Sequence, residues 1–356
     1  MNLSIPSSTE SALMGTECGL SNILQGNIDH TNTITYVTVS FLIVLAIATC
    51  PFTILLNILV IVVVKTKSHL KTNSNIVLAC LAVTDASVGV VAQPLYIAIR
   101  ILGLLGDTSD EYCRLLHSSR NVFRLLAGSS VLHLFLMSFE RYLAINHPFK
   151  YPRMLNKARI LKASVLAWLI AVMATIPFTI TSVRFYLTIN NALLGVFAAL
   201  IISCQVVVYK ETRRHERHIA TNQISAEARE KFRKEKKALK LTTCVIFFLV
   251  LSYLPIFIVR LLLLTSTITS VNLANISLNF VTCIAILNSL INPIIYCVRL
   301  RQFRVAFIQM LLRKNNLQAE QFERQIFKSS NKQEPGHKFE NEGKHHEVRQ
   351  IGRAHV

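Results

Sequence analysis

Seven long apolar segments run through this chain, and they limit its possible folds more than any other feature. A bilayer core needs about 20 apolar residues for each helix that crosses it. Hydrocarbon offers no hydrogen-bond partner to the backbone, and the segments are too long for barrel strands, so each is expected to be a helix. The expected spans are 38–64, 76–99, 113–145, 160–180, 190–209, 239–264 and 275–298. The sequence therefore predicts an all-α fold, a bundle of seven transmembrane helices.

The composition agrees with an integral membrane protein, because 52% of the residues are hydrophobic and only 16% are charged. The formal net charge is +19, but most Lys and Arg residues lie between or after the apolar segments. This placement favours contact with an anionic membrane face over nucleic-acid binding. The eight Cys are scattered singly, without the paired spacing of metal ligands, so no zinc site is predicted.

The orientation follows from the basic residues of the connecting segments. Connections after the first, third and fifth spans are rich in Lys and Arg, whereas the alternate connections are poor in them. We predict a multi-pass protein of the plasma membrane with residues 1–37 outside the cell. No cleaved signal peptide is recognised there, so the first span is expected to direct insertion. Glycosylation sequons begin at Asn2 and Asn275, on the predicted outer side.

Two spans contain polar residues that a membrane interior normally rejects. Asp85 lies in the second span, and Asn292-Pro293-Ile294-Ile295-Tyr296 closes the seventh. A carboxylate in the middle of a bilayer costs several kcal/mol, so it persists where it faces a hydrated bundle interior with polar partners. The sequence therefore predicts a polar site buried among the helices.

Short motifs occur in a fixed order, one on each of several spans. They are Asn57, Leu81-Ala82-Val83-Thr84-Asp85, Glu140-Arg141-Tyr142, Trp168, Ser252-Tyr253-Leu254-Pro255 and Asn292-Pro293-Ile294-Ile295-Tyr296. Together they resemble the rhodopsin-like (class A) family of G protein-coupled receptors over residues 38–315. The resemblance implies a conformational function, in which an extracellular ligand leads to activation of a heterotrimeric G protein.

The resemblance implies a latch between the third and sixth helices. In the family, the Arg that matches Arg141 pairs with its neighbour, here Glu140, and with a Glu that matches Glu235. Parting these charges would open a cleft for a G protein as the sixth helix moves outward. The alternative is a pair of solvated surface charges worth under about 1 kcal/mol.

Pro255 and Pro293 are expected to help the switch, because each removes a backbone hydrogen bond and bends its helix. Tyr253 stands where the family usually has Trp, and Tyr296 is expected to move inward and meet Tyr209. The alternative is that the prolines are only kinks. The implied switch residues are Glu140, Arg141, Tyr142, Glu235, Tyr209, Tyr253, Pro255, Asn292, Pro293 and Tyr296.

The resemblance also implies an internal sodium ion that acts as a negative modulator, and no other cofactor is expected. The matching residues are Asp85, Asn57, Ser130, Asn288, Ser289 and Asn292. The alternative is a hydrogen-bonded network with a protonated Asp85 and no ion.

The ligand is not expected to be a simple monoamine or retinal. Phe123 stands where amine receptors carry an Asp, and Ile286 stands where opsins carry the retinal-binding Lys. The outer halves of the helices offer cations instead, which suit a carboxylate or phosphate in a small molecule, an acidic peptide or an anionic lipid. The alternative is that these cations extend to the headgroups. The expected ligand-binding residues are Phe123, Arg120, Arg124, Ala127, Tyr253 and Arg260.

The chain departs from the family pattern at its cysteines. Cys113 lies three residues farther from Arg141 than the usual Cys of the third helix, and the second external loop has none. A bridge between Cys18 and Cys113 is therefore a hypothesis, with Cys283 as the rival partner. The fifth helix also lacks its usual proline. These features resemble melanocortin, cannabinoid and lysophospholipid receptors more than amine receptors, and adenosine-like receptors remain an alternative.

The segments after the third and seventh spans suggest contacts on the cytoplasmic side. Phe149, after Pro148, matches the apolar knob that inserts into a G protein beside Arg141. Residues 301–315 are expected to form an amphipathic helix on the membrane lipids, after the bundle of residues 38–300. Residues 316–356 are polar with little periodicity, so a disordered tail with weak arrestin recruitment is expected.

The sequence favours a receptor over other classes of membrane protein. A transporter usually shows internal repeats, and none is found. No nucleophile, base or metal constellation appears, so the chain is not expected to be an enzyme. An orphan seven-helix scaffold or modulator without G protein coupling is the alternative.

Overall fold

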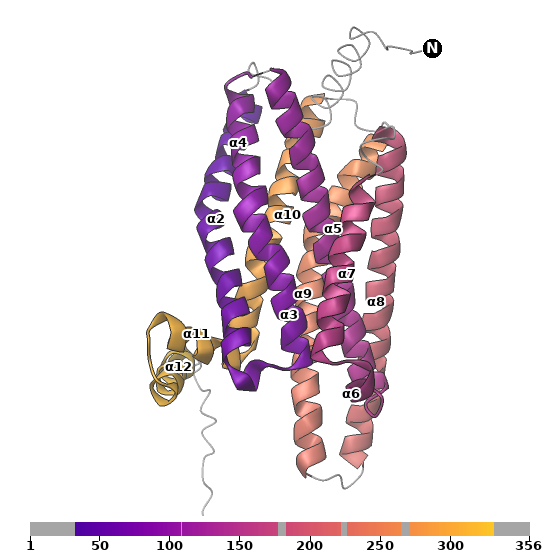
Figure 1. Cartoon of the computed structure of the whole chain (residues 1–356), viewed down its shortest axis with the longest axis vertical. Helices are drawn as coiled ribbons and strands as arrows, with labels where there is room; N and C mark the ends of the chain where they lie inside the picture. The colour runs from indigo at the N-terminus through magenta and orange to yellow at the C-terminus, as the bar shows by residue number, and fades with distance from the viewer. Residues whose placement is uncertain (1–32, 108, 177–182, 222–225, 265–270, 331–356) are drawn as a thin grey trace, which may run out of the picture. The chain divides into compact units, whose positions relative to one another are not determined.

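The computed structural model describes residues 33–107, 109–176, 183–221, 226–264 and 271–330 (Figure 1). Every regular element in this part of the chain is a helix. Seven helical segments are long and apolar enough to cross a membrane, by length and composition. The predicted all-α fold with seven membrane-spanning helices is thus confirmed. The chain divides into two units, Met1–Phe307 and Ile308–Val356.

The first unit contains the bundle. Its long helices are α2 (Thr33–Thr66), α3 (Asn73–Ser87), α4 (Gln93–Leu104), α5 (Asp110–Asn146), α7 (Lys157–Thr175), α8 (Val183–Thr221), α9 (Ala226–Leu264) and α10 (Val271–Arg299). Its short elements are η1 (Ser68–Leu70), η2 (Val88–Ala92) and α6 (Tyr151–Met154). Two helices follow, α11 (Arg301–Leu311) and α12 (Asn316–Ser330).

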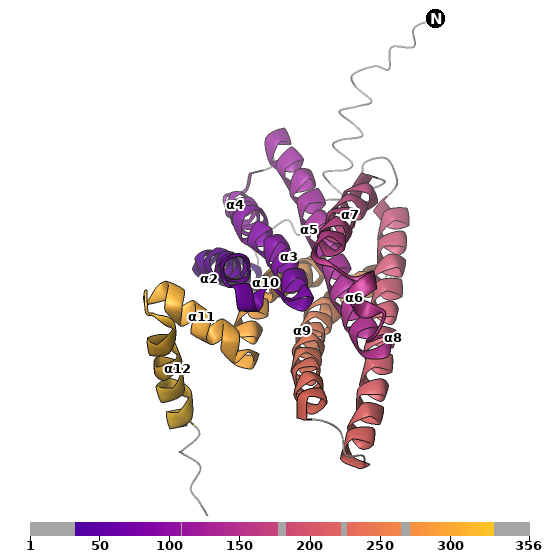
Figure 2. The ribbon, with the colours of Figure 1, turned by 60° about the horizontal axis from the view of Figure 1, so that its bottom comes forward.

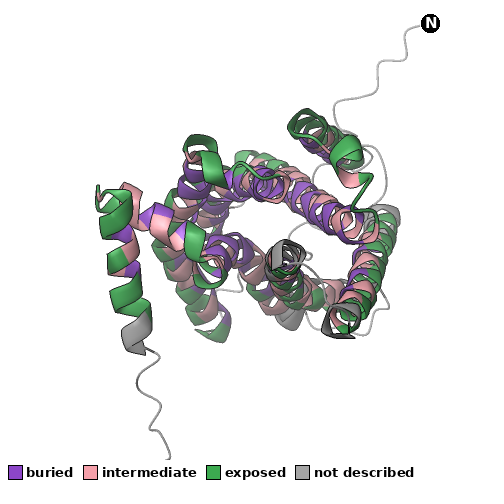
Figure 3. Ribbon diagram, turned by 90° about the horizontal axis from the view of Figure 1, so that it is seen from below, coloured by how far each residue is buried: buried purple, intermediate pink, exposed green. Residues whose placement is uncertain are grey.

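Helix α5 lies at the centre of the packing in the first unit. It packs on α3, α7 and α8, whereas α10 packs on α2, α3 and α9 (Figures 1 and 2). The buried faces of these helices point into the bundle, and the exposed faces point outward (Figure 3). The exposed faces carry many large apolar side chains, such as Phe41, Leu166 and Val196. This distribution is expected for helices surrounded by lipid.

Polar side chains mark where the helices begin. Thr72, Ser109 and Asn156 each accept a hydrogen bond from a backbone N–H in the first turn of α3, α5 and α7, respectively. Such N-caps satisfy N–H groups that have no partner within the helix. Asp110 and Glu111 add negative charge at the start of α5, where the helix dipole favours it. The connections between spans are therefore specified locally.

A buried histidine joins α5 to α7. His133 Nε2 lies 2.7 Å from Ser164 Oγ, and its Nδ1 lies 2.7 Å from the carbonyl oxygen of Ser129. The His133 ring meets the Trp168 ring edge-on, with centroids 6.4 Å apart. A polar group in hydrocarbon is stable only when its hydrogen bonds are made, and this one uses both ring nitrogens.

The second span is not one regular helix. The sequence predicted a continuous segment over 76–99, but a π-helical turn, η2, separates α3 from α4. Pro94 explains the break, because proline has no N–H and its ring crowds the carbonyl one turn earlier. The thiol of Cys50 lies 3.3 Å from the Gly89 carbonyl in this turn. The irregular turn places Val88 and Ala92 against the core of the bundle.

Helix α11 begins directly after the last span, within the predicted range of 301–315. Phe303 and Phe307 are buried, and the Phe303 ring packs against Tyr296 with centroids 6.2 Å apart. Arg304 Nη1 donates to the carbonyl oxygens of Cys297 and Val298 at 3.1 and 2.8 Å. A cation is favourable at the carboxyl end of a helix, so Arg304 helps to end α10.

The second unit corrects one expectation. Residues 316–356 were predicted to be disordered, but Asn316–Ser330 form α12, so the prediction is wrong for these residues. The Gln318 N–H donates to Asn315 Oδ1 at 2.9 Å, and the Asn315 N–H donates to Gln318 Oε1 at 3.3 Å. This reciprocal pair is a capping box, which starts a helix even in a polar segment. Residues 331–356 lie outside the described part.

Close packing at Gly89 generates a stability prediction. A Cβ on Gly89 would lie 2.8 Å from Ile54 Cγ1 and 3.2 Å from the backbone nitrogen of Ile54, so one of them must shift. Gly89→Ala is expected to destabilise the bundle by about 1–3 kcal/mol, the usual cost of overpacking. The control is Gly195→Ala, where a Cβ meets nothing within 4 Å. Thermal unfolding in detergent measures both, and equal melting temperatures for the two variants would contradict this packing.

Candidate functional site

A buried polar network links α3 to α10 in the bundle interior. Asp85 is only 1% exposed, and Asn292 Nδ2 donates to its Oδ2 at 2.8 Å. Ser289 is also buried and lies beside this carboxyl group. The structure thus brings together three of the residues expected around an internal ion.

The network extends to α2 and α9. Asn57 Nδ2 donates to the carbonyl oxygens of Thr53 and Ser289 at 2.9 and 3.0 Å, which joins α2 to α10. Ser252 Oγ donates to Asn288 Oδ1 at 3.5 Å, which joins α9 to α10. Asn57, Asn288 and Ser289 are all buried. Side chains from four helices therefore meet in one polar interior.

The network fits a small hard cation. Asp85 Oδ1, Asn57 Oδ1 and Asn292 Oδ1 are buried oxygens without a hydrogen-bond partner among the described residues. A buried acceptor left unsatisfied costs about 1–3 kcal/mol, so a bound ion or water would relieve it. Oxygen ligands suit sodium, which would supply positive charge opposite the Asp85 carboxylate. No group of three or more His, Cys, Asp or Glu that would hold a metal ion is found in the described part.

A second polar cluster lies at the opposite end of α5 from Asp110. Arg141 Nε and Nη2 donate to the two carboxylate oxygens of Glu140, each at 2.5 Å. Arg141 also donates to Ser74 of α3, and Ser74 Oγ donates to Glu140 Oε1 at 3.1 Å. Arg141 is 2% exposed and Glu140 is fully buried. For Arg141 and Glu140, this burial contradicts the alternative of solvated surface charges.

Helix α6 contributes to this cluster through Tyr151. Its hydroxyl donates to Glu140 Oε1 at 2.5 Å. Burial, together with the neighbouring Glu140 carboxylate, raises the pKa of Tyr151 well above its usual range. Tyr151 therefore stays protonated across physiological pH and remains a hydrogen-bond donor. Tyr151 and Ser74 were not predicted from the sequence, because their contact depends on how α6 and α3 approach α5.

The predicted latch partner on α9 is Glu235. The helix α9 runs through this position, but the Glu235 side chain lies outside the described residues. Its proposed pairing with Arg141 therefore stays a prediction. Tyr142, the third residue of the same motif, packs against a core cluster formed by Ile145, Val208 and Leu239. This cluster joins α5 to α8 and α9 near the Arg141 end.

A polar bridge that the sequence analysis missed joins three helices near Arg141. Gln205 Nε2 of α8 donates to Ser138 Oγ of α5 at 3.3 Å. Thr243 Oγ1 of α9 donates to Gln205 Oε1 at 3.2 Å. The signal was visible in the sequence, because Gln205 is an isolated amide in the apolar fifth span. We call Ser138, Gln205 and Thr243 the amide bridge.

The two expected switch tyrosines do not meet in this structure. Tyr296 is fully buried, and its hydroxyl has no hydrogen-bond partner among the described residues. Tyr209 is 56% exposed, and its hydroxyl accepts a hydrogen bond from Arg213 Nε at 3.0 Å. Their meeting was expected on activation, so the two positions observed here leave that expectation untested.

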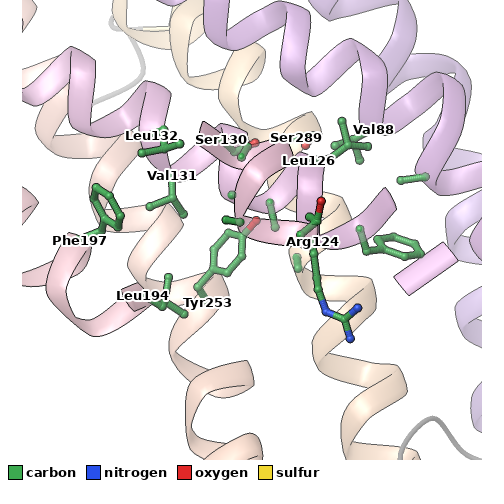
Figure 4. Close-up of a pocket in the computed structure, with 18 of the residues that line it drawn as sticks. Val88, Arg124, Leu126, Ser130, Val131, Leu132, Leu194, Phe197, Tyr253 and Ser289 are labelled. Atoms are coloured by element: carbon green, nitrogen blue, oxygen red, sulfur yellow. The ribbon is translucent and has the colours of Figure 1, made fainter. Parts of the chain in front are cut away.

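The bundle contains a cavity of about 410 Å³ lined by α5, α7, α8, α9, α10 and η2 (Figure 4). Five of the six expected ligand residues line it: Arg120, Phe123, Arg124, Ala127 and Tyr253. The side chain of the sixth, Arg260, lies outside the described residues. Ser130 and Ser289 also line the cavity, so it reaches the polar network around Asp85.

The cationic end of the cavity is built on α5. Arg120 is buried, and Arg124 Nη1 donates to Asn121 Oδ1 at 3.0 Å. Phe123 packs edge-on against Tyr96 of α4, with ring centroids 6.4 Å apart. The Arg100 guanidinium lies over the Tyr96 ring, 5.3 Å from its centroid. The cavity therefore combines guanidinium groups with aromatic and aliphatic walls.

Two helices contribute to the cavity wall in a way that was not predicted from the sequence. The additional lining residues from α7 and α8 are Ile170, Ala171, Ala174, Thr175, Leu193, Leu194 and Phe197. Their apolar character is ordinary for membrane spans, so nothing in the local sequence distinguished them. Figure 4 shows Phe197 and Leu194 on the side of Val131 and Leu132, away from Val88.

The predicted disulfide, the glycosylation sites and Phe149 can also be located relative to the described residues. Cys113 is disulfide-bonded, whereas Cys283, the rival partner, is a free thiol. Cys18 lies outside the described residues, as do Asn2 and the side chain of Asn275. Phe149 follows Pro148 in the turn between α5 and α6 and is 95% exposed, which leaves this apolar side chain available to a partner.

The chain matches the model of the family named 7 transmembrane receptor (rhodopsin family) over residues 56–188 and 179–296. The chain belongs to this family. It is therefore a G protein-coupled receptor and a multi-pass membrane protein, and it is not an enzyme.

Several curated receptors are similar to it. The histamine H2 receptor of Cavia porcellus is 26% identical over 304 residues, which cover 78% of this chain and 80% of the relative. The adenosine receptor A3 of Bos taurus is 24% identical over 303 residues, which cover 78% of this chain and 90% of the relative. The 5-hydroxytryptamine receptor 2B of Dichotomyctere fluviatilis is 30% identical over 139 residues, or 38% of this chain and 28% of the relative. The names of these relatives include both amine and nucleoside receptors, so they do not specify a subfamily.

The polar network generates a prediction about sodium. Ligand binding to the folded state stabilises it by about 1.4 kcal/mol at ten times the dissociation constant. Replacing potassium by sodium is therefore expected to raise the melting temperature of the purified receptor by a few degrees. Asp85→Asn should abolish this difference, because it removes the only carboxylate of the network.

Asp107→Asn is the matched control, since Asp107 lies outside the bundle network and caps the nearby Ser109 N–H. It should keep the sodium effect. Equal melting temperatures in sodium and potassium for the unchanged receptor would mean that the network holds water and no ion.

Proposed function

We propose that this receptor binds an anionic ligand in the cavity beside Arg120 and Arg124 and activates a heterotrimeric G protein through outward movement of α9. The observation that supports this most is the cavity itself, which carries two guanidinium groups at one end and reaches the Asp85 network at the other. The receptor lies in the plasma membrane with residues 1–37 outside the cell, as the basic connections indicate. The cavity then opens toward the extracellular half of the bundle.

The cations determine the ligand class. Arg120 and Arg124 are four residues apart, so they lie on one face of α5. A guanidinium binds carboxylate or phosphate with two parallel hydrogen bonds. Phe123, between them in sequence, offers no carboxylate for an amine and instead packs on Tyr96. The ligand therefore supplies the negative charge, and Ala127 and Tyr253 supply apolar and aromatic contacts below it.

Ligand binding is transmitted through the helices that line the cavity. Tyr253 lies two residues before Pro255, where α9 lacks one backbone hydrogen bond and bends readily. A contact at Tyr253 therefore shifts the α9 segment that precedes the proline and ends near Arg141. Near the Arg141 end, α9 is held by the amide bridge, so outward movement must break the Thr243 to Gln205 hydrogen bond.

Movement of α9 exposes the surface that binds the G protein. Arg141 leaves Glu140, and Tyr209 and Tyr296 move together, which gives the buried Tyr296 hydroxyl a partner. The exposed Phe149, beside Pro148, inserts into the G protein next to Arg141. A sodium ion at Asp85 opposes the change, because its oxygen ligands come from the helices that rearrange.

A disulfide at Cys18 and a glycan at Asn2 are also proposed, in residues 1–32, which lie outside the described part. Six of the eight cysteines are free thiols and Cys113 is bonded, so we assign Cys18 as its partner. Peptide mapping without reduction tests this pairing, and a Cys113 peptide linked to any other cysteine would contradict it. Asn2 is the proposed glycosylation site, which a mobility shift after glycosidase treatment checks.

The alternative function is a seven-helix scaffold that does not couple to a G protein. Burial of Arg141 beside Glu140 favours coupling, because a buried ion pair is costly and is best explained by a second state in which it separates. Nucleotide exchange on reconstituted G proteins distinguishes the two functions. Absence of any agonist-stimulated exchange across G protein subtypes would favour the scaffold.

The amide bridge generates a prediction about basal activity. Hydrogen bonds between membrane helices are each worth roughly 0.6–1.7 kcal/mol. Gln205→Leu removes the one bond of the bridge that holds α9 and is expected to shift the equilibrium toward the active state by about 3- to 18-fold. Basal nucleotide exchange on the reconstituted G protein measures this. Ser203→Ala is the matched control, because Ser203 Oγ bonds only to the Ala199 carbonyl of its own helix among the described contacts. Unchanged basal exchange in Gln205→Leu would show that the bridge does not hold α9.

The cationic end of the cavity generates a prediction about ligands. In a screen of carboxylates, phosphate monoesters and amines, the anions are expected to stimulate nucleotide exchange. Arg124→Ala should lower their potency about 10- to 100-fold, as hydrogen bonds to charged groups contribute about 1.5–3 kcal/mol. Arg114→Ala, at an exposed position on the same helix, should leave the potency unchanged. An agonist amine whose potency is the same in Arg124→Ala would overturn the proposal.

A further inference from the structure

The cavity extends to the outer face of the bundle between α7 and α8. Both helices pack on α5, but their described residues make little contact with each other. Among the seven spans, these two have the smallest buried shares in the part of the chain described. Helix α5 therefore closes the inner side of the gap between them, and the outer side of the gap faces lipid.

The same side chains line the cavity and face outward at this gap. Ile170 of α7 is 44% exposed and Leu193 of α8 is 46% exposed, and both are cavity-lining residues. Ala174, also exposed, lies one turn beyond Ile170 on α7. In a membrane this exposed surface contacts acyl chains, because no water reaches it. The cavity is thus continuous with the hydrocarbon around the bundle.

The height of the gap places it in the outer half of the bilayer. Helix α7 begins at Lys157, on the proposed cytoplasmic side, and rises about 1.5 Å per residue. Ile170 then lies roughly 20 Å and Thr175 roughly 27 Å from the start of α7, against a hydrocarbon core of about 30 Å. A molecule that enters at this level comes from the outer leaflet.

The charge and shape of the cavity indicate what enters. Arg120 and Arg124 lie toward the extracellular end of the α5 lining. This lining continues along the helix to Leu132, about 18 Å from Arg120. The walls toward α7 and α8 are apolar, with Phe197 and Leu194 on that side (Figure 4). A peptide backbone would lose its hydrogen bonds against such walls. A volume of about 410 Å³ lies near the lower end of the range for small-molecule sites, which suits one chain better than two.

We propose that the ligand is an anionic single-chain amphiphile that enters from the outer leaflet between α7 and α8. Its carboxylate or phosphate binds Arg120 and Arg124, and its chain lies in the gap beside Ala174 and Leu193. This inference rests on the proposed function, in which the cavity is the ligand site. It adds the ligand class and the route of entry.

Photolabelling of the full-length receptor in nanodiscs tests the proposal. The probe is dodecyl phosphate with a diazirine at the end of its chain, and specific label is the part displaced by excess dodecyl phosphate. Dodecyltrimethylammonium, which has the same chain and the opposite charge, controls for effects on the bilayer. Specific label is expected on peptides of α7 and α8, and the cationic amphiphile should not displace it.

Two variants separate the headgroup site from the chain site. Arg124→Ala is expected to reduce specific label at least about 10-fold through the headgroup. Ala174→Trp fills the gap and should reduce it by a similar factor, whereas Leu166→Trp, exposed on α7 away from the cavity lining, should not. Thermal stabilisation by butyl phosphate, which has a short chain, should depend on Arg124 and be retained in Ala174→Trp.

The outcomes distinguish this inference from the proposed function. Specific label that depends on Arg124 but maps to other helices, or that persists in Ala174→Trp, overturns the lipid route and leaves the anion site standing. Stabilisation by butyl phosphate without specific label of the long chain does the same, since it indicates a water-soluble anion. If neither probe depends on Arg124, the anion site fails and this inference fails with it.

Discussion

The structure depends on one constraint, which is that polar side chains surrounded by hydrocarbon must find their partners inside the bundle. Asp85 and Asn292 meet across α3 and α10, and Asn57 reaches the backbone of α10 from α2. Each of these contacts fixes the rotation of a helix about its own axis, because the side chain must point inward. The apolar surface cannot do this, since lipid is as favourable a neighbour for Leu or Val as another helix is.

Helix α5 connects the features that matter for a receptor. One end carries Arg124 in the cavity, and the other carries the buried pair of Glu140 and Arg141, with the amide bridge through Ser138 just before it. In contrast, α9 packs most closely on α10, and its described polar contacts with α8 are Thr243 to Gln205 and the ion pair of Lys236 with Glu216. A central helix packed on three others, beside one joined to α8 by polar contacts that can separate, is a physical basis for two states that differ by a few kcal/mol.

The sequence predicted features that depend on spacing along one helix and missed features that depend on how helices approach one another. The seven spans and the inward position of Asp85 follow from hydropathy and from the cost of a charge in lipid. The break near Pro94 and the helix capped by Asn315 had local signals that were not weighed. The contact of Tyr151 with Glu140 and the gap between α7 and α8 had none, because crossing angles and helix rotations set them.

Recognition and transmission are physically separable in this bundle. The Asp85 network and the Arg141 cluster use hydrogen bonds among side chains of the protein itself, so an amino-acid substitution among the ligand-binding residues leaves them intact. The cavity wall contributed by α7 and α8 takes no part in those networks, and it borders lipid. Substitutions such as Phe123 in place of an acidic residue can therefore change the ligand class without loss of the switch. This separation explains why membership of the family is plain from the interior motifs, whereas the ligand must be argued from the charges and walls of the cavity.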